Sequence, residues 1–363
     1  MEIQFYKAEC GDAAKIRFLG NDQKFHNIFI DSGHQRTFRP ILLEEILNLK
    51  EMGEYIDLWI LSHIHDDHIG GVLKYLDLIK SGELEDVVTQ WYYNVPRFIT
   101  VNAHKPNSKI SNASSINQAD IIYEYLKTNK KLPEKDITAD LQTRNLFGLI
   151  LTLLTPSSTK LNKLRNKYPI DSSNELERHE LDSVSDAKAI KDNDYLIRLL
   201  EFEIEDFVED KSVENGSSIS LITEFKNRKI LWLADSHPND VIKSLEKLGY
   251  SKENQFECDW VKVSHHGSSG NNNSELYSFI KCNNYLFSVN GENKYNLPEK
   301  KCLARILRNK NRSKGSVYNF YFTYDNELLR SIFKVDGTEI YNELKFNVHY
   351  LKNSKYLKID ISK

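Results

Sequence analysis

A short run of histidines and aspartates in the first quarter of the chain has the residue types that bind metal ions. It reads SHIHDDHIGG over residues 62–71. His63 and His65 alternate at the end of an apolar stretch, so an extended chain points both imidazoles the same way. Asp67 and His68 follow, and we expect a loop to turn them toward a neighbouring point. Imidazole nitrogens and carboxylate oxygens are ligands of borderline cations such as Zn²⁺.

The number of candidate ligands in this run favours two ions. A catalytic ion normally has about four ligands and does not take all of them from one segment. Four adjacent candidates therefore indicate two cations side by side, roughly 3.5–4 Å apart. A solvated histidine-rich loop is the alternative. The apolar stretch before the run, and Gly70 and Gly71 directly after it, argue against that alternative.

Other apolar stretches also end in residues that can join such a site. One ends in Asp31, another ends in Asp235, and a third leads to His265 and His266. Loops at strand ends are where folds place reactive groups. Asp235 could bridge two ions and hold one with each oxygen, whereas a strand-end aspartate far from any metal is usually a turn or cap residue.

Two further side chains could support that site. Asp31 could hydrogen-bond a ligand histidine and so fix its tautomer. His237 comes two residues after Asp235 and could either support a ligand or contact a substrate phosphate. An exposed turn histidine before Pro238 is the alternative for His237.

The elements that must position these residues alternate between strands and helices. Apolar runs separated by turns predict strands in the first part of the chain, and residues 40–52 have the spacing of a helix. Residues 217–225 and 228–235 predict a β-hairpin. This pattern favours a layered α/β domain built from two sheets. Near the end of the chain we expect one helix followed by three strands, at residues 300–309, 318–325, 329–337 and 356–362.

We expect a single domain over residues 1–363. Two polar stretches, 94–147 and 157–214, are predicted to be insertions or mobile loops within it, with one amphipathic helix near 116–127. His104 and His179 lie in these stretches and are expected at the surface. Residues 310–363 are predicted to form a β-rich extension packed on the domain.

Composition excludes several classes of protein. Of the 363 residues, 40% are hydrophobic and 11% aromatic, so disorder throughout is excluded. No apolar stretch approaches the roughly 20 residues of a membrane span, and no secretory signal is visible, so we expect a cytoplasmic protein without membrane contact. Its four cysteines form no CxxC pair.

The net charge of −3 does not by itself indicate a protein that binds nucleic acid. A local basic cluster over residues 300–314 could attract a phosphate backbone if it folds beside the site. An ordinary solvated helix face is the alternative for that cluster.

Taken together, these motifs resemble the metallo-β-lactamase superfamily. The resemblance rests on Asp31, the HxHxDH run at 63–68, Asp235 and the HHGS of residues 265–268. It implies a four-layer αββα sandwich with the metals at one edge. Within the superfamily, the chain is most similar to the branch that contains the hydrolase domain of the competence DNA-uptake channel ComEC and its free-standing relatives.

Two more motifs carry the resemblance to that branch. Its members have a Gly-Asp turn like Gly11-Asp12 and an Asn-x-Ser-Ser segment like the one that begins at Asn215 and ends at Ser218. Asn215 and Ser218 are therefore candidates for supporting a ligand or contacting substrate. Free-standing relatives also occur in anti-phage defence operons, so a protein partner is one expectation.

The resemblance implies a metal-dependent hydrolase. We expect a phosphodiesterase or nuclease, acting on DNA or RNA with a metal-bound hydroxide, with one or two ions of Zn²⁺ or Mn²⁺ per chain. Asp67 would orient the nucleophile as well as bind metal. Of the HHGS pair, His266 is assigned to metal and His265 to catalysis, and the opposite assignment stays open. The histidine that is not a ligand would hold the substrate anion or protonate the leaving group.

Two functional alternatives remain open. One is a hydrolase of the same fold that acts on a small-molecule ester or lactone. The other is a partner-dependent component with a degraded metal site. The second alternative draws on the long polar insertions and on Leu297, which stands where relatives often have a histidine before a proline. If that histidine normally binds metal, the second site is weaker, filled by water or empty. A further departure from the family pattern is that no histidine lies near Thr155.

Overall fold

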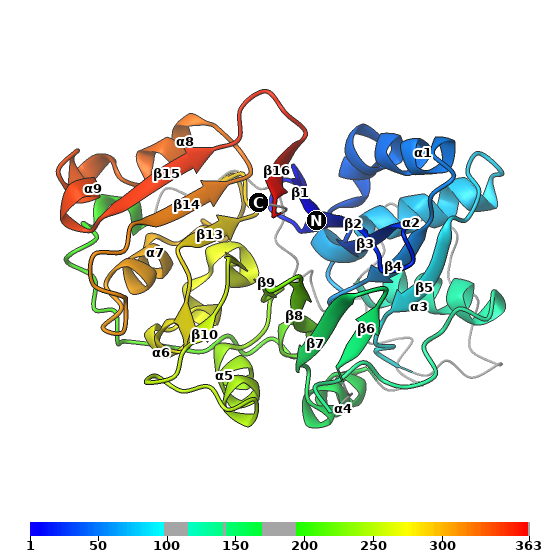
Figure 1. Cartoon of the computed structure of the whole chain (residues 1–363), viewed down its shortest axis with the longest axis horizontal. Helices are drawn as coiled ribbons and strands as arrows, with labels where there is room; N and C mark the ends of the chain where they lie inside the picture. The colour runs from blue at the N-terminus through cyan, green and yellow to red at the C-terminus, as the bar shows by residue number, and fades with distance from the viewer. Residues whose placement is uncertain (98–114, 141–142, 169–193, 362–363) are drawn as a thin grey trace.

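Two β-sheets lie against each other in the computed structural model, which describes residues 1–97, 115–140, 143–168 and 194–361 (Figure 1). The first sheet has six strands in the order β16-β1-β2-β3-β4-β5. Their bounds are β1 Glu2–Tyr6, β2 Ala13–Leu19, β3 Phe25–Asp31, β4 Ile56–Ile60, β5 Val88–Tyr92 and β16 Tyr356–Asp360.

The second sheet has eight strands in the order β15-β14-β13-β11-β9-β8-β7-β6. From β9 to β15 its neighbouring strands run parallel. A separate parallel pair joins β10 to β12. The bounds are β6 Arg144–Leu146, β7 Leu149–Thr155, β8 Ser220–Phe225, β9 Arg228–Trp232, β10 Phe256–Glu257, β11 Trp260–Lys262, β12 Ile280–Lys281, β13 Asn284–Phe287, β14 Tyr318–Phe322 and β15 Phe346–Tyr350.

Strand alternation builds the layers. Ile28 and Ile30 belong to the apolar core between the two sheets, whereas Phe29, between them in the chain, packs with the helices outside the first sheet. On β9, Leu231 likewise packs with the outer helices, and Trp232 faces the other sheet. Strands buried on both faces read as continuous apolar runs, which is the pattern in the sequence.

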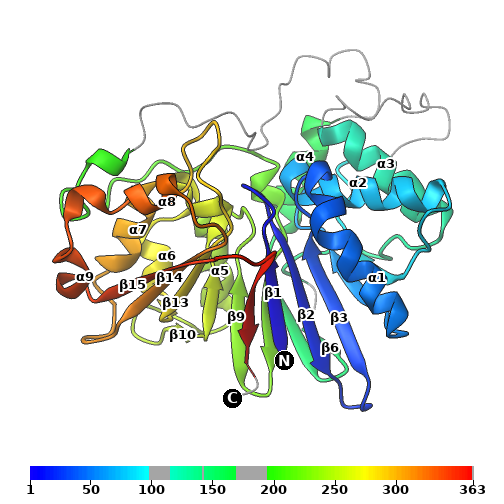
Figure 2. The same ribbon diagram turned by 90° about the horizontal axis from the view of Figure 1, so that it is seen from above.

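Helices cover the outer face of each sheet (Figure 2). The side chains of α1 to α4 belong to the core outside the first sheet, and those of α5 to α9 to the core outside the second. The four-layer αββα prediction is therefore confirmed. The helices are α1 Leu43–Glu51, α2 Asp66–Lys80, α3 Ser115–Thr128, α4 Ser158–Lys167, α5 Pro238–Lys247, α6 Ser274–Ser278, α7 Lys300–Leu307, α8 Glu327–Ser331 and α9 Ile340–Glu343. A π-helical turn, Phe38–Leu42, leads into α1, and short 3₁₀ turns include Gln35–Thr37 and Asn215–Ser217.

One expected strand is a helix. Residues 329–337 were predicted to be extended, but α8 occupies Glu327–Ser331. Asn326 caps this helix, because its side chain accepts a hydrogen bond from the Leu329 backbone N–H. Leu329, Ile332 and Phe333 are all buried, which is helical spacing on one face.

The end of the described chain is shared between the two sheets. β16 pairs with β1 in the first sheet, while β14 and β15 extend the second. Within the polar stretch 157–214, Tyr195, Leu199 and Phe202 are buried in the outer core of the second sheet. His104 and His179 lie outside the described residues. Among the helices that the structure describes, none has the length and apolar character needed to cross a bilayer.

Candidate metal centre

The candidate ligands follow strands that end at one edge of the sandwich. β3 ends at Asp31, and its parallel neighbour β4 leads to the HxHxDH run. In the other sheet, parallel strands β9 and β11 lead to Asp235 and to His265 and His266. Because the carboxyl ends of parallel strands meet at one edge of a sheet, residues far apart in the sequence converge there.

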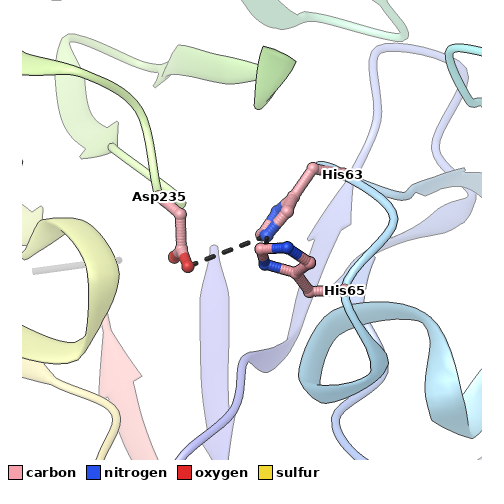
Figure 3. Close-up of side chains that lie close together, drawn as sticks. All are labelled: His63, His65 and Asp235. Carbon is pink, nitrogen blue, oxygen red and sulfur yellow. Dashed lines mark hydrogen bonds and ion pairs between the residues drawn. The ribbon is translucent and has the colours of Figure 1, made fainter. Parts of the chain in front are cut away.

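Two clusters of side chains form at this edge. In the first cluster, His63 Nε2 lies 3.0 Å from His65 Nδ1 and 3.7 Å from Asp235 Oδ2 (Figure 3). In the second cluster, Asp67 Oδ2 lies 3.2 Å from His266 Nε2 and 3.6 Å from His68 Nε2. Within the described ranges, each set of three could hold a metal ion, and so could a third set that joins Asp12 to His68 and Asp235. All seven residues are buried.

Asp235 lies between the two clusters. Its Oδ2 faces His63, and its Oδ1 lies 3.4 Å from His68 Nε2. Neither oxygen of this buried carboxylate has a hydrogen-bond partner. Asp67 Oδ1 and His68 Nε2, which lie at the second cluster, also lack one. Buried polar atoms are costly when unpaired, so this donor set fits one or two divalent cations.

Helix α2 begins inside the motif. Asp67 and His68 were expected in a loop, but they occupy the first turn of α2, which starts at Asp66. Gly70 and Gly71 let this turn pack tightly against the segment after β3. A Cβ atom on Gly71 would lie 2.3 Å from the carbonyl oxygen of Ser32, which is too close for any residue other than glycine.

The histidines of the second cluster are held from behind. His68 Nδ1 lies 2.8 Å from Asp31 Oδ2, and Asp31 also accepts hydrogen bonds from the backbone N–H and hydroxyl of Ser62. His266 Nδ1 donates to the backbone carbonyl of Ser288 over 2.8 Å. Each ring therefore carries its proton on Nδ1 and presents Nε2 toward Asp67.

Sequence reasoning missed two residues behind this cluster. Asp12 is buried, with Oδ1 3.6 Å from His266 Nδ1 and Oδ2 4.0 Å from His68 Nδ1. Lys262 on β11 donates to Asp12 Oδ2. The only signal for Asp12 in the sequence was the Gly-Asp turn of the family resemblance, and nothing singled out Lys262.

His265 faces the first cluster. Its Nε2 lies 3.6 Å from Asp235 Oδ2, and its Nδ1 lies 2.8 Å from Asn271 Oδ1. The Asn271 amide nitrogen donates to Asp210 and to the Asp235 carbonyl, so Asn271 Oδ1 is an acceptor. A neutral His265 therefore has its proton on Nδ1 and its lone pair on Nε2. At 13% side-chain exposure, it is more accessible than the six buried cluster residues.

The remaining predicted residues lie around this histidine. Asn215 donates to Asp210 over 2.6 Å and lies 3.5 Å from His265 Nδ1. Ser218 is fully buried, and its hydroxyl has no hydrogen-bond partner. His237 is buried rather than exposed, and its Nδ1 accepts a hydrogen bond from Lys160 over 2.9 Å. Sequence reasoning had not singled out Lys160, Asp210 or Asn271.

Both departures from the family pattern have a local explanation. Thr155 takes part in a buried hydroxyl network, with its Oγ1 2.9 Å from Ser236 Oγ and 2.6 Å from Ser220 Oγ. Leu297 is buried in the apolar core outside the second sheet. Neither side chain belongs to a group that could hold metal in the described part of the chain.

The first cluster has the protonation states that a cation needs. Burial lowers the pKa of His63 well below its ordinary value, and burial also lowers the pKa of His65. Burial acts in the opposite sense on Asp235, but nearby His265 and His68 bring its pKa well below its usual range. Neutral imidazoles and ionised carboxylates are the forms that bind metal.

Carboxylates also dominate the field around the second cluster. Burial lowers the pKa of His68, but Asp235, Asp31 and Asp67 outweigh burial and raise it well above its ordinary value. Burial raises the pKa of Asp67, but His68 and a hydrogen bond from His266 lower it below its ordinary value. The position between these carboxylates therefore attracts positive charge.

Several site residues have a strained backbone. Asp31, Ala234, His265 and His266 all have positive φ, between 44° and 55°. This left-handed conformation costs a residue with a Cβ about 1–2 kcal/mol. Such strain persists where the surrounding structure enforces it, and it is typical of functional sites.

Part of the basic cluster over residues 300–314 is used inside the fold. Arg305 is buried and donates to the backbone carbonyls of Ile204, Ser269, Asn272 and Asp206. Lys300 is buried against Asp336. These two cations hold loops together, whereas Lys310 and Lys314 in the same cluster are exposed.

The comparisons with known proteins agree with the motif. Residues 26–84 match the family model described as the metallo-beta-lactamase superfamily, a segment that contains the whole HxHxDH run. The search of curated proteins gave no match.

Solved structures similar to the chain include YhfI, a metallo-beta-lactamase fold protein from Bacillus subtilis. It shows 10% identity and a TM-score of 0.42, with 99% of this chain and 100% of that chain covered. A long form RNase Z from yeast shows 12% identity and a TM-score of 0.33, with 80% of this chain and 37% of that chain covered. The chain therefore has a four-layer αββα fold, matches the metallo-beta-lactamase superfamily model over residues 26–84, and in its described part carries histidine and aspartate clusters that can hold metal.

Proposed function

We propose that the chain is a two-ion, metal-dependent hydrolase that cleaves phosphodiester bonds. The observation that carries this proposal is Asp235, a buried carboxylate with one oxygen toward each cluster and a hydrogen-bond partner at neither. A carboxylate between two ligand sets is suited to bridging a pair of cations, and paired cations suit in-line displacement at phosphorus.

The two clusters divide the proposed ligands. His63, His65 and Asp235 would hold the first ion. Asp67, His68 and His266 would hold the second, with Asp235 shared between the two ions. Mixed nitrogen and oxygen ligands suit Zn²⁺ or Mn²⁺. When bound, such ions lower the pKa of water toward neutrality and offset negative charge on the substrate.

Two residues would act on the reacting atoms. Asp67 Oδ1 has no hydrogen-bond partner and can accept a hydrogen bond from the attacking water, which orients it. His265 would donate a proton to the leaving oxygen from Nε2, which lies on the Asp235 side. Burial lowers the pKa of His265, but Asp235 and Asp210 outweigh it and raise the pKa above its ordinary value, which favours the proton-donating form.

His265 has a second possible role as a ligand of the first ion. Its lone pair faces Asp235 in the neutral form, and the family's usual histidine near Thr155 is missing. The two roles differ in what His265→Ala would remove. Loss of a ligand lowers the number of ions bound per chain, whereas loss of an acid lowers the rate and leaves two ions in place.

His237 and Lys160 would contact a substrate phosphate. Lys160 has only donors, so the His237 nitrogen that it contacts must be an acceptor, and the proton of a neutral ring lies on Nε2. That N–H is buried and has no hydrogen-bond partner. Lys160 is partly exposed and also pairs with Asp240 at 2.7 Å. A fixed donor beside an exposed cation suits a non-bridging phosphate oxygen.

We also propose that residues 1–363 form one domain, supported by the pairing of β16 with β1. The insertions and the C-terminal extension would then be parts of the same unit.

Hydrolysis of labelled single- and double-stranded DNA and RNA tests the function. The purified chain is supplied with Mn²⁺ or Zn²⁺, with EDTA as one control and Asp67→Ala as another. Asp66→Asn is the matched variant, because Asp66 precedes Asp67 but pairs with His34 away from both clusters. We expect cleavage that EDTA and Asp67→Ala abolish and Asp66→Asn retains. A folded chain that cleaves none of the four substrates, but hydrolyses an aryl ester or a lactone, would contradict the proposal.

A further inference from the structure

A buried ion pair crosses from one sheet to the other beneath the second cluster. Lys262 lies on β11 of the second sheet, and its register partners Trp232 and Leu286 face the space between the sheets. Its ammonium donates to Asp12, which directly precedes β2 of the first sheet. Both side chains are almost completely buried, with 4% and 9% exposure. An ion pair in this position is costly to bury and therefore needs a reason.

The turn that carries Asp12 is built around the ligands. The Asp12 backbone N–H donates to the Asp67 carbonyl over 3.1 Å, and the Gly11 carbonyl accepts from the Ser288 hydroxyl over 2.6 Å. A Cβ atom on Gly11 would lie 2.4 Å from the Asp67 carbonyl oxygen. Only glycine allows this approach. The turn is thus fixed to the segment that supplies Asp67 and to the residue that holds His266 from behind.

Asp12 lies on the side of both histidines that faces away from Asp67. Its oxygens approach the Nδ1 atoms of His68 and His266, at 4.0 Å and 3.6 Å. These Nδ1 atoms already pair with Asp31 and the Ser288 carbonyl, and Lys262 already occupies Asp12 Oδ2. Asp12 could form a metal-binding set with His68 and Asp235, but the His68 atom that it approaches is Nδ1, which pairs with Asp31. We therefore assign Asp12 to the support of the rings.

We propose that Asp12 and Lys262 are a positioning pair that sets the affinity of the second cluster for its ion without binding the ion. Asp67 and His68 follow a strand of the first sheet and His266 follows a strand of the second, so the cluster forms only when the two sheets keep a fixed position relative to each other. The ion pair between Asp12 and Lys262 joins the two sheets directly beneath the cluster and so fixes their relative position there. The Asp12 carboxylate also lies near Nδ1 of both rings, and Lys262 balances its charge. This inference rests on the two-ion function proposed above.

Zinc affinity, measured by competition with a chromophoric chelator, tests the pair in the full-length chain. Asp12→Asn keeps the shape of the side chain but leaves the Lys262 charge unpaired behind the cluster. Loss of such an outer partner typically weakens metal binding by about 10- to 100-fold. We expect the affinity for one of the two zinc ions to fall by that factor and the affinity for the other to stay unchanged. With Mn²⁺, the electron paramagnetic resonance signal of a coupled ion pair should change to that of an isolated ion.

A second variant and a matched control keep the test decisive. Asp12→Asn combined with Lys262→Met carries no unpaired buried charge and is expected to fold. It should bind the second ion more weakly than wild type but more tightly than Asp12→Asn alone. Lys15→Met removes a comparable buried pair, Lys15 with Glu45, whose side chains have 4% and 12% exposure. It should lower the melting temperature and leave both zinc affinities unchanged.

The outcomes separate this inference from the proposed function. A double variant with wild-type affinity for both ions would overturn the role of the pair, and so would a Lys15→Met chain that loses the second ion equally. In both cases the two-ion function stands, because wild type still binds two ions. A wild-type chain that binds fewer than two ions overturns both proposals.

Discussion

The two clusters differ in how their side chains are supported. In the second cluster, His68 and His266 each have a partner on the nitrogen that faces away from Asp67, and Asp12 and Lys262 lie behind them. In the first cluster, His63 Nδ1 lies 3.1 Å from the Ser62 hydroxyl, whereas His65 Nε2 has no hydrogen-bond partner. Supported ligands are pre-organised for an ion, whereas unsupported ligands lose freedom when an ion binds. If each cluster binds an ion as we propose, we expect the second ion to be held more tightly and the first to exchange more readily.

This proposed order differs from one possibility that the sequence left open. If the histidine that Leu297 replaces normally binds metal, the second site would be weaker, filled by water or empty. In the structure, His266 lies beside Asp67 and gives that cluster a nitrogen from the second sheet. No histidine lies near Thr155, and the Thr155 hydroxyl contacts those of Ser220 and Ser236.

Removal of a ligand from either cluster should have the largest effect. Asp67→Ala takes away a ligand of the second ion, and His63→Ala a ligand of the first. We expect each to lower kcat by more than about 100-fold, beyond the loss typical of an outer partner. Steady-state kinetics with saturating Mn²⁺ measures this, and circular dichroism checks the fold. Turnover close to wild type in either folded variant would contradict a two-ion mechanism.

Loss of support should have a smaller effect, and a different one in each cluster. Asp31→Asn removes the carboxylate that orients His68 and should lower the affinity for the second ion by about 10- to 100-fold. Asn271→Ala loosens His265 beside the first cluster. If His265 is the acid, this variant lowers kcat and leaves both zinc affinities unchanged. Weaker binding of the first ion would instead assign His265 as a ligand.

Substitutions at the proposed phosphate contact should change substrate binding but not metal binding. Lys160→Met and His237→Gln should each raise KM for a phosphodiester by about tenfold, or ~1.4 kcal/mol. Zinc content should stay at the wild-type value, because neither residue belongs to a cluster in the described chain. Unchanged KM in both variants would show that the substrate lies elsewhere.

The smallest expected effect concerns His26, which lies away from both clusters. It gives the folded protein a pH-dependent stability that does not involve the metal-binding residues. Burial lowers the pKa of His26, but hydrogen bonds with Asp57 and Asp22 outweigh it and raise the pKa above its ordinary value. His26 therefore stabilises the fold fully below about pH 6.5, its unfolded pKa. That contribution is lost as pH rises through the higher folded pKa.

Urea unfolding between pH 6 and pH 9 measures this term. Wild type should lose less than about 1 kcal/mol relative to His26→Gln as the pH rises. A difference between the two proteins that grows in the opposite direction would contradict the assigned sign.

Much of the fold and of the clusters could be predicted from local patterns. The apolar runs of β3 and β4 and the spacing of His63 to His68 are properties of short segments. Asp12 and Lys262 were missed because 250 residues separate them, and only the packing of the two sheets brings them together. Asn271 was missed because its role depends on which carboxylate and which imidazole its amide meets.

Helix boundaries were the other source of error. Asp67 and His68 look like loop residues because aspartates favour turns, yet aspartates also favour the first turn of a helix, where the helix dipole stabilises them. The helical spacing of Leu329, Ile332 and Phe333 was hidden in a stretch that also reads as a strand.

The most direct test of the two-ion account counts the ions and follows activity together. Metal-free protein is titrated with Mn²⁺ while ion content, spin coupling and cleavage of a labelled phosphodiester are recorded at each step. The account predicts two ions per chain, a coupled pair, and cleavage that rises only as the second site to fill becomes occupied. A folded chain that binds no Mn²⁺ and no Zn²⁺, or that reaches full activity with one ion, would contradict it.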